Sequence, residues 1–262
     1  MIFETTHMVR NISLLITCFI IFNVSLMGSA SPQLQDSTIQ ADSTHITSLK
    51  AKQLIVPATL ISLGSLGAIF NDNILNREIN KIFRGNHHCN IDCCLRFAPS
   101  IGYIALGEVG LTSKHSLKER VAVAATSHAI MVALGSGLKN IVHEQRPNLS
   151  NNHSFPSGHT AMAFTGAELM RIEYGANTGL AGYAVATSVA LMRLYNNKHW
   201  LNDVVMGAGI GILSARLGYA LLPWERKLLG WNKKKASSTI IAMMPTYDFH
   251  AQTVALSLVA HF

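Results

Sequence analysis

Long apolar segments separated by short polar stretches are the feature that most constrains the fold of this chain. Runs of this length exceed ordinary β-strands and predict α-helices. A bilayer span needs about 20 apolar residues, and several of the segments are shorter. The pattern therefore predicts an all-α bundle of six helices, at about 54–70, 97–111, 121–138, 159–171, 177–193 and 203–222.

Four charged residues lie inside or at the edges of these segments, although only 13% of the residues are charged and 49% are hydrophobic. They are Glu108, Glu168, Arg171 and Arg216. An unpaired charge inside hydrocarbon costs several kcal/mol. We therefore expect a bundle that is partly buried in itself and only partly in lipid.

The two ends of the chain differ in character from the helical part. Residues 1–30 join a positive charge to an apolar stretch that ends in Gly-Ser-Ala, a pattern typical of an export signal. An uncleaved anchor helix is the alternative. Residues 31–52 are polar and predict a flexible spacer. Residues 53–225 form the predicted helical domain, and residues 226–262 are a basic linker followed by a short β-hairpin-like tail.

The net charge of +7 is compatible with nucleic acid, an anionic membrane or phosphorylated substrates as partners. The sequence has no run of Lys and Arg with interleaved aromatic residues, which argues against nucleic acid. Its densest basic cluster is interrupted by Leu228 and Trp231, as expected beside lipid headgroups, although a solvated helix end is equally compatible. The cluster consists of Arg226, Lys227, Lys233, Lys234 and Lys235.

Three cysteines follow two histidines closely, which raises the question of a zinc site. Cys89, Cys93 and Cys94 come just after His87 and His88. Their spacing matches no common zinc module. If the export signal is removed, Cys18 goes with it, and the odd number of cysteines that remains fits one disulfide plus a spare thiol about as well. The sequence therefore predicts no bound metal.

The first of three polar clusters runs from Lys139 to Pro147. Lys139 and Arg146 are seven residues apart, close to two helical turns, so they are expected on one helical face. Pro147 disfavours helical backbone at Arg146. We therefore expect the helix to end there, with both cations at its C-terminal end.

The second cluster, Phe155-Pro156-Ser157-Gly158-His159, opens the next predicted helix. Ser157 is a good helix cap, and Gly158 leaves the backbone N–H groups uncovered. A phosphate at this position would accept backbone hydrogen bonds and be stabilised by the positive end of the helix dipole. His159 in the first turn is placed to reach a departing oxygen.

The third cluster, from Arg193 to Asp203, spans the connection before the last helix. His199 and Asp203 are four residues apart, so the carboxylate is expected to hold one imidazole nitrogen and leave the other free to attack. Each cluster by itself also fits an ordinary role, as helix-end cations, a helix start or a surface ion pair. Together they converge, because all three fall at the same side of an up-and-down bundle.

The order K-x6-RP, PSGH and R-x5-H-x3-D resembles the type 2 phosphatidic acid phosphatase (PAP2) superfamily, which also contains bacterial acid phosphatases and vanadium haloperoxidases. Strict motif identity is confined to Lys139 through Asp203, and the helix count extends the resemblance to about residues 54–223. The resemblance implies a six-helix PAP2-type bundle and a phosphatase that needs no metal or other cofactor. Three cations would supply the charge stabilisation that a metal otherwise provides.

The resemblance also implies a role for each matching residue. His199 would be the nucleophile that forms a phosphohistidine, Asp203 would orient it, and His159 would protonate the leaving oxygen and later activate water. The phosphate would be bound by Lys139, Arg146, Ser157, Gly158 and Arg193.

One position departs from the family, which usually has Ser before the third-motif arginine, where this chain has Met192. One phosphate hydrogen bond is therefore in doubt. Among the remaining histidines, His128 and His143 are interpreted as structural, with His143 the strongest candidate for an additional role.

The resemblance and the apolar helices together favour a phosphorylated lipid of the bacterial cell envelope as substrate, with the site facing the periplasm. A soluble periplasmic acid phosphatase acting on small organic phosphates is the main alternative. A vanadium haloperoxidase and a non-catalytic membrane scaffold fit less well, because Lys139 is typical of the phosphatases and a scaffold needs no acid, nucleophile and cation set. If the export signal is cleaved and all six helices cross the membrane, their simple alternation places the site on the cytoplasmic face. This contradicts the expected periplasmic site, so at least one of the two premises must be wrong.

Overall fold

The computed structural model describes residues 51–69, 74–85, 90–231, 240–248 and 253–261. The predicted export signal and nearly all of the predicted spacer lie outside the described residues, as do Cys89 and its neighbouring histidines and the lysines at 233–235. The chain divides into two compact units, Met1–Leu222 and Pro223–Phe262, which are described separately.

The described residues contain eight helices rather than six. Six of them overlap the predicted apolar segments, and the short helices α3 and α4 were not predicted. The helices are α2 (Ala51–Ile69), α3 (Ile74–Phe83), α4 (Asp92–Leu95), α5 (Ala98–Ala105), α6 (Leu117–Val142), α7 (Gly158–Tyr174), α8 (Ala176–Tyr195) and α9 (Leu201–Leu228).

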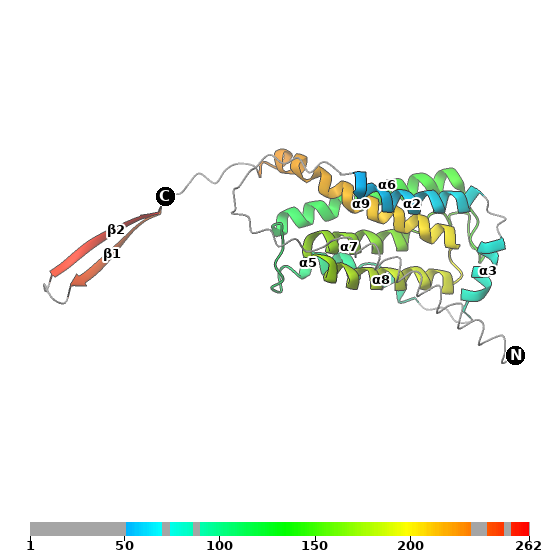
Figure 1. The fold of residues 1–262 in the computed structure, drawn as a ribbon, viewed down its shortest axis with the longest axis horizontal. Helices are drawn as coiled ribbons and strands as arrows, with labels where there is room; N and C mark the ends of the chain where they lie inside the picture. Colours follow the sequence, from blue (N-terminus) through cyan, green and yellow to red (C-terminus); the bar gives the residue numbers. More distant parts are fainter. Residues whose placement is uncertain (1–50, 70–73, 86–89, 232–239, 249–252, 262) are drawn as a thin grey trace. The chain divides into compact units, whose positions relative to one another are not determined.

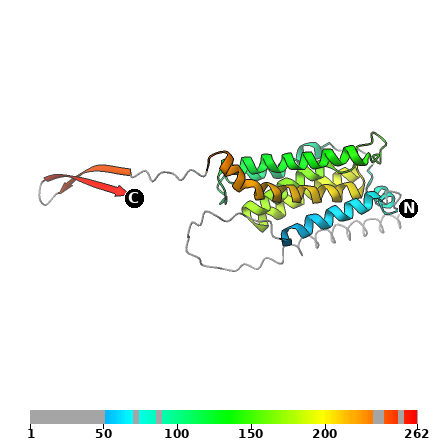
Figure 2. The same ribbon diagram turned by 90° about the horizontal axis from the view of Figure 1, so that it is seen from above.

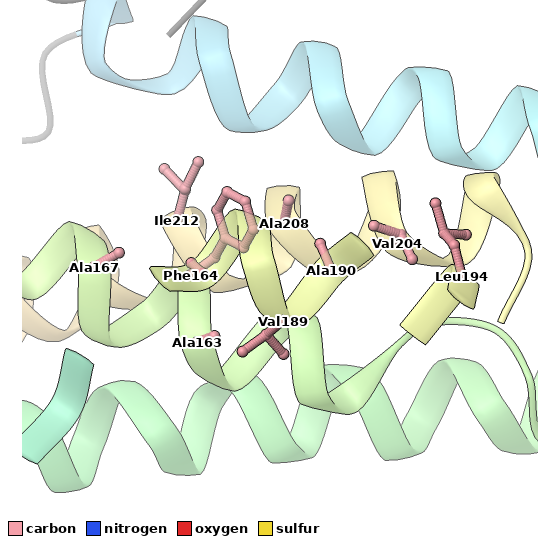
Figure 3. Close-up of a cluster of buried hydrophobic side chains, with 10 residues drawn as sticks. Ala163, Phe164, Ala167, Val189, Ala190, Leu194, Val204, Ala208 and Ile212 are labelled. Carbon is pink, nitrogen blue, oxygen red and sulfur yellow. The ribbon is translucent and has the colours of Figure 1, made fainter. Parts of the chain in front are cut away.

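The helix α7 lies in the middle of the first unit, and α8 packs along it (Figure 1). Only Gly175 separates them, and its φ of +94° is a backbone conformation that glycine adopts without strain, so the chain reverses at once. The two helices and α9 bury a common apolar cluster, which Figure 3 shows in close-up. Its members include Ala163, Phe164 and Ala167 of α7, Val189, Ala190 and Leu194 of α8, and Val204, Ala208 and Ile212 of α9.

Glycines allow α2 to lie directly against α9. A Cβ atom at Gly64 would come within 2.7 Å of the Met206 Cβ, and one at Gly67 within 2.6 Å of the Asn202 Cβ. Neither space accepts a side chain, so the two backbones approach closely. Figures 1 and 2 both show α2 running alongside α9, whose first turn carries part of the predicted site.

The charged residues of the apolar segments have partners. Glu168 is fully buried in α7 and accepts hydrogen bonds from Arg171 Nε and Arg216 Nε, both at 2.6 Å. Arg120, buried in α6, donates to Glu108 at 2.5 Å. Each buried charge of this group, Glu168 and Arg120, therefore has an oppositely charged partner, as buried ionised groups generally do.

Three of the described helices, α2, α6 and α9, are long and apolar enough to cross a membrane. Most of α2 and α6 is not buried inside the protein, whereas most of α9 is. Ile55, Leu66 and Ile69 of α2 and Val132 and Ile141 of α6 are large exposed apolar side chains. Such surfaces favour contact with lipid over water.

The second unit contains the only strands among the described residues. Strand β1 (Ile240–Asp248) pairs antiparallel with β2 (Thr253–His261), so that Ile240 lies opposite His261 and Asp248 opposite Thr253.

Candidate active site

The first predicted cluster begins in α6 but leaves it earlier than expected. The helix ends at Val142 because His143 takes the left-handed conformation, with φ 50°, and its N–H bonds to the Lys139 carbonyl. Arg146 therefore lies in a turn, where its N–H donates to the Asn151 carbonyl at 3.0 Å. The prediction that Lys139 and Arg146 share a helical face is wrong.

Lys139 instead ties the end of α6 to the loop that precedes α7. Its Nζ donates to the carbonyl of His153 at 3.1 Å and to that of Pro156 at 2.6 Å. This ammonium group is thereby held next to the second cluster, 17 residues further along the chain.

The second cluster starts α7 as predicted, but Ser157 does not cap the helix with its side chain. Its hydroxyl lies 2.9 Å from Thr160 Oγ1, and its backbone N–H donates to the Asp203 carbonyl at 3.0 Å. A Cβ atom at Gly158 would meet nothing within 4 Å. The backbone at the start of α7 therefore faces open space next to the first turn of α9.

The third cluster brings His199 against Asp203. Asn197 ends the preceding helix with a left-handed backbone, φ 55°, and α9 begins at Leu201. Asp203 Oδ2 lies 3.3 Å from His199 Nδ1 and accepts the Trp200 N–H at 2.8 Å and the Ser154 hydroxyl at 2.5 Å. Because Nδ1 faces the carboxylate, Nε2 is the nitrogen left for another partner.

Burial and three cations act together on His199. Removal from water, followed by the charges of Arg193, Arg146 and Lys139, holds the pKa of His199 well below its ordinary value. Burial, followed by the neighbouring charge of Arg193, also lowers the pKa of Arg146. Three positive side chains, two from the first cluster and one from the third, thus act on one imidazole, an arrangement suited to binding an anion.

His159 lies close to one of these cations, Arg193, and to a further one, Arg96. Burial, and then Arg193 and Arg96, lower the pKa of His159 to about 3. Arg193 is itself held by Asp92, whose Oδ2 accepts its Nη1 donor at 2.6 Å. The structure therefore brings together the two histidines, Asp203 and the three cations that the sequence singled out.

Several residues of this region were not predicted from the sequence. Asp92 and Arg96 precede the site by more than forty residues, and nothing in their local pattern marks them. Ser154 stands immediately before the second cluster and could have been noticed there. Glu144, inside the first cluster, is buried, hydrogen-bonds Asn202 Nδ2 at 3.2 Å and contacts the carboxyl group of Asp203.

One group of potential metal ligands lies within the described residues. Ligand atoms of Asp92, Cys93 and His159 fall within 4.8 Å of one another. However, Asp92 is paired with Arg193, and Arg96 contacts His159. Two guanidinium groups this close oppose a dication, so the charge distribution favours an anion here. The thiols of Cys93 and Cys94 are free and exposed.

Comparison with known proteins identifies the fold family. Residues 120–227 match the PAP2 superfamily. The chain is 32% identical over 200 residues to a Lipid A 1-phosphatase of Porphyromonas gingivalis, a match that covers 71% of this chain and 43% of that protein. The chain therefore spans less than half the length of this relative.

Two solved structures are also similar. The crystal structure of Aquifex aeolicus LpxE is 23% identical with a TM-score of 0.46, over 56% of this chain and 96% of that one. The structure of a transmembrane PAP2 type phosphatidylglycerolphosphate phosphatase from Bacillus subtilis is 16% identical with a TM-score of 0.48, over 69% of this chain and 98% of that one. All three polar clusters lie within residues 120–227, so the match to the PAP2 superfamily covers the whole set of predicted site residues.

Proposed function

We propose that this chain is a metal-independent phosphatase that hydrolyses a phosphate monoester or diphosphate of a membrane lipid through a phosphohistidine intermediate. The observation that carries the proposal is the position of His199. Its Nδ1 is held by Asp203, and it lies within electrostatic reach of Lys139, Arg146 and Arg193. A nucleophile surrounded by cations is the arrangement that phosphoryl transfer needs, because the transferred group carries its charge on its outer oxygens.

In the first step, Nε2 of His199 attacks the phosphorus atom and the bond from phosphorus to the lipid oxygen breaks. The three cations and the open backbone at Gly158 hold the phosphoryl oxygens. The imidazole becomes positively charged as the P–N bond forms, and the carboxylate of Asp203 stabilises that charge. His159 gives its proton to the departing oxygen.

In the second step, His159 removes a proton from water, the water oxygen attacks phosphorus, and the P–N bond breaks to release inorganic phosphate. His159 is neutral in the free protein, since its pKa is lowered to about 3. A bound phosphate dianion offsets the cations that lower this pKa, so substrate binding supports the protonated form required in the first step.

A phosphorylated lipid is the substrate class that the surface favours. The apolar side chains of α2 and α6 are exposed over helices long enough to cross a membrane, and the relative from Porphyromonas gingivalis is named for a lipid substrate. The soluble acid phosphatase considered from the sequence is not favoured, because a soluble protein rarely exposes a continuous apolar surface of this kind.

We further propose the arrangement of the whole chain: an export signal or anchor at 1–30, a spacer at 31–52, a helical catalytic domain at 53–225, and a basic linker with a hairpin tail at 226–262. The active site would face the periplasm. Ser150, exposed in the loop between α6 and α7, allows a test. With the four cysteines of the chain, Cys18, Cys89, Cys93 and Cys94, changed to Ser, a Ser150→Cys variant should react with a membrane-impermeant maleimide in intact spheroplasts. Labelling only after lysis would place the site on the other side.

The function itself is tested by phosphate release from detergent-purified protein. A panel of lipid monophosphates, lipid diphosphates and soluble phosphomonoesters should show turnover of the lipids, and His199→Gln should abolish it. A substrate labelled with ³²P should transfer label to the wild type in an acid-labile, alkali-stable form and leave His199→Gln unlabelled. Release from soluble esters alone would support the periplasmic acid phosphatase, and no release from any substrate would refute the enzyme.

A further inference from the structure

Arg96 is a cation at the active site that the proposed mechanism does not use. It lies between α4 and α5, where its backbone N–H bonds to the Asp92 carbonyl at 3.2 Å and closes the end of α4. The next residue, Phe97, precedes α5 directly. The backbone of Arg96 is therefore fixed by a helix on either side.

The guanidinium group of Arg96 lies over the ring of His159. Its Nη1 is 3.2 Å from His159 Nε2 and 3.4 Å from Nδ1. A donor in the plane of an imidazole can approach only one ring nitrogen closely, so near-equal distances place this nitrogen above the ring face. In that position Arg96 leaves both ring nitrogens of His159 accessible to a ligand oxygen.

Most of the hydrogen-bonding capacity of Arg96 is unused. In the part of the chain that the structure describes, its side chain contacts only His159 and the ring of Phe97, whose centroid is 4.6 Å from Cζ. Its Nε is buried without a hydrogen-bond partner. A guanidinium group carries five N–H donors in a planar fork that fits a phosphate group.

The charge of Arg96 is also uncompensated. Arg193, the other arginine next to His159, forms an ion pair with Asp92 at 2.6 Å. Among the described residues, no carboxylate lies within ion-pair distance of Arg96. An excess positive charge therefore remains beside the residue assigned as the proton donor to the leaving group, in addition to the three cations assigned to the transferred phosphate.

We propose that Arg96 is a specificity-determining residue that binds an anionic oxygen on the leaving-group side, so that the enzyme prefers lipid diphosphates to lipid monophosphates. This inference rests on the proposed function. His199 Nε2 would attack the terminal phosphorus, and the bond from this phosphorus to the bridging oxygen would break. The leaving group would be the lipid monophosphate, with its bridging oxygen protonated by His159 and its remaining phosphate oxygens bound by Arg96. Water would then release the terminal phosphate.

A lipid monophosphate offers no such contact, because its leaving group is a neutral alcohol. The loss of one charge-assisted hydrogen bond corresponds to about a 10- to 100-fold effect. Arg96→Gln should therefore lower kcat/KM for a polyprenyl diphosphate about 10- to 100-fold and change kcat/KM for the monophosphate of the same chain by less than about threefold. Arg96→Lys should recover part of the loss, since a lysine restores the charge but not the fork.

The experiment uses the full chain in detergent with this matched pair of substrates. Arg84→Gln, which removes an exposed arginine outside the site, is the control and should leave both rates unchanged. Equal losses on both substrates would show that Arg96 only positions His159, and no loss on either would show that it has no role; both results overturn the proposal. A wild type that releases phosphate from neither lipid would instead refute the proposed function itself.

A second measurement guards against a variant that folds poorly. Inorganic pyrophosphate should inhibit the wild type more strongly than orthophosphate, and the ratio of the two inhibition constants should approach one in Arg96→Gln. Because a ratio is independent of the fraction of active protein, an unchanged ratio would contradict the assignment even when the total activity is low.

Discussion

Ser154 donates its hydroxyl to Asp203 Oδ2 at 2.5 Å, and the same oxygen lies 3.3 Å from His199 Nδ1. Both side chains of this hydrogen bond are fully buried. Ser154, in the loop that leads into α7, thus orients the carboxylate of Asp203. That carboxylate in turn orients His199, the proposed nucleophile.

Ser154→Ala should lower kcat about 10-fold while changing KM little, because a charge-assisted hydrogen bond to a carboxylate contributes about 1.5–3 kcal/mol and this one does not touch the substrate. Ser188→Ala removes an exposed serine hydroxyl on α8 and serves as the control. Steady-state kinetics on the preferred lipid measure kcat and KM for both variants and the wild type. A change confined to KM would mean that Ser154 contacts the substrate instead.

The ion pair between Asp92 and Arg193 is buried, with Nη1 and Oδ2 2.6 Å apart. Removing one partner leaves an uncompensated buried charge, which costs about 3–5 kcal/mol. Arg193→Gln should therefore unfold more easily than the wild type, and the double variant Asp92→Asn/Arg193→Gln should regain much of that stability without regaining activity. Thermal unfolding and phosphate release separate the two effects. A double variant no more stable than the single one would contradict the pairing.

The two histidines of the site should make stability depend on pH. The pKa of His199 is held well below its ordinary value and that of His159 at about 3, chiefly by burial. Below about pH 6.5 the unfolded chain takes up protons on these imidazoles while the folded protein does not. Stability should therefore decrease as the pH falls from 7.5 to 5.

His199→Gln removes one of these groups, so its stability should depend less steeply on pH than that of the wild type, by up to about 1.4 kcal/mol per pH unit. Ser188→Ala, at an exposed and non-titrating side chain of α8, should keep the wild-type slope. The unfolding temperature in detergent, followed across this pH range, measures both. Equal slopes in His199→Gln and the wild type would show that His199 does not stay neutral on folding.

Glu168 should be a main determinant of the stability of the bundle. It is fully buried and holds both Arg171 and Arg216 at 2.6 Å. Glu168→Gln leaves these arginines without their anion and should destabilise the protein by about 3 kcal/mol. Glu78→Gln, which breaks the exposed pair with Lys81, should change stability by less than about 0.5 kcal/mol. Similar unfolding temperatures for the two variants would show that the buried carboxylate is dispensable.

The sequence by itself determined the positions of the long helices and singled out the residues of the proposed site. The six long apolar segments predicted helical structure because no strand is that long, and α2 and α5 to α9 lie at these positions. The four-residue spacing of His199 and Asp203 predicted their contact, although His199 lies just before α9 and not on a face of that helix. The resemblance to the PAP2 superfamily pointed to the remaining residues of the pocket.

Tertiary structure decided what local patterns do not encode. Lys139 lies on α6 and Arg146 in the turn that follows, because His143 ends the helix with a left-handed backbone where the residue spacing had predicted continuous helix. The partners of the site, Asp92 and Arg96, arrive from a segment far away in the sequence. Helix packing decides whether a charged side chain from a distant segment forms an ion pair, as Asp92 does, or contacts a ring, as Arg96 does. That packing depends on all the core side chains together, so no local pattern reveals it.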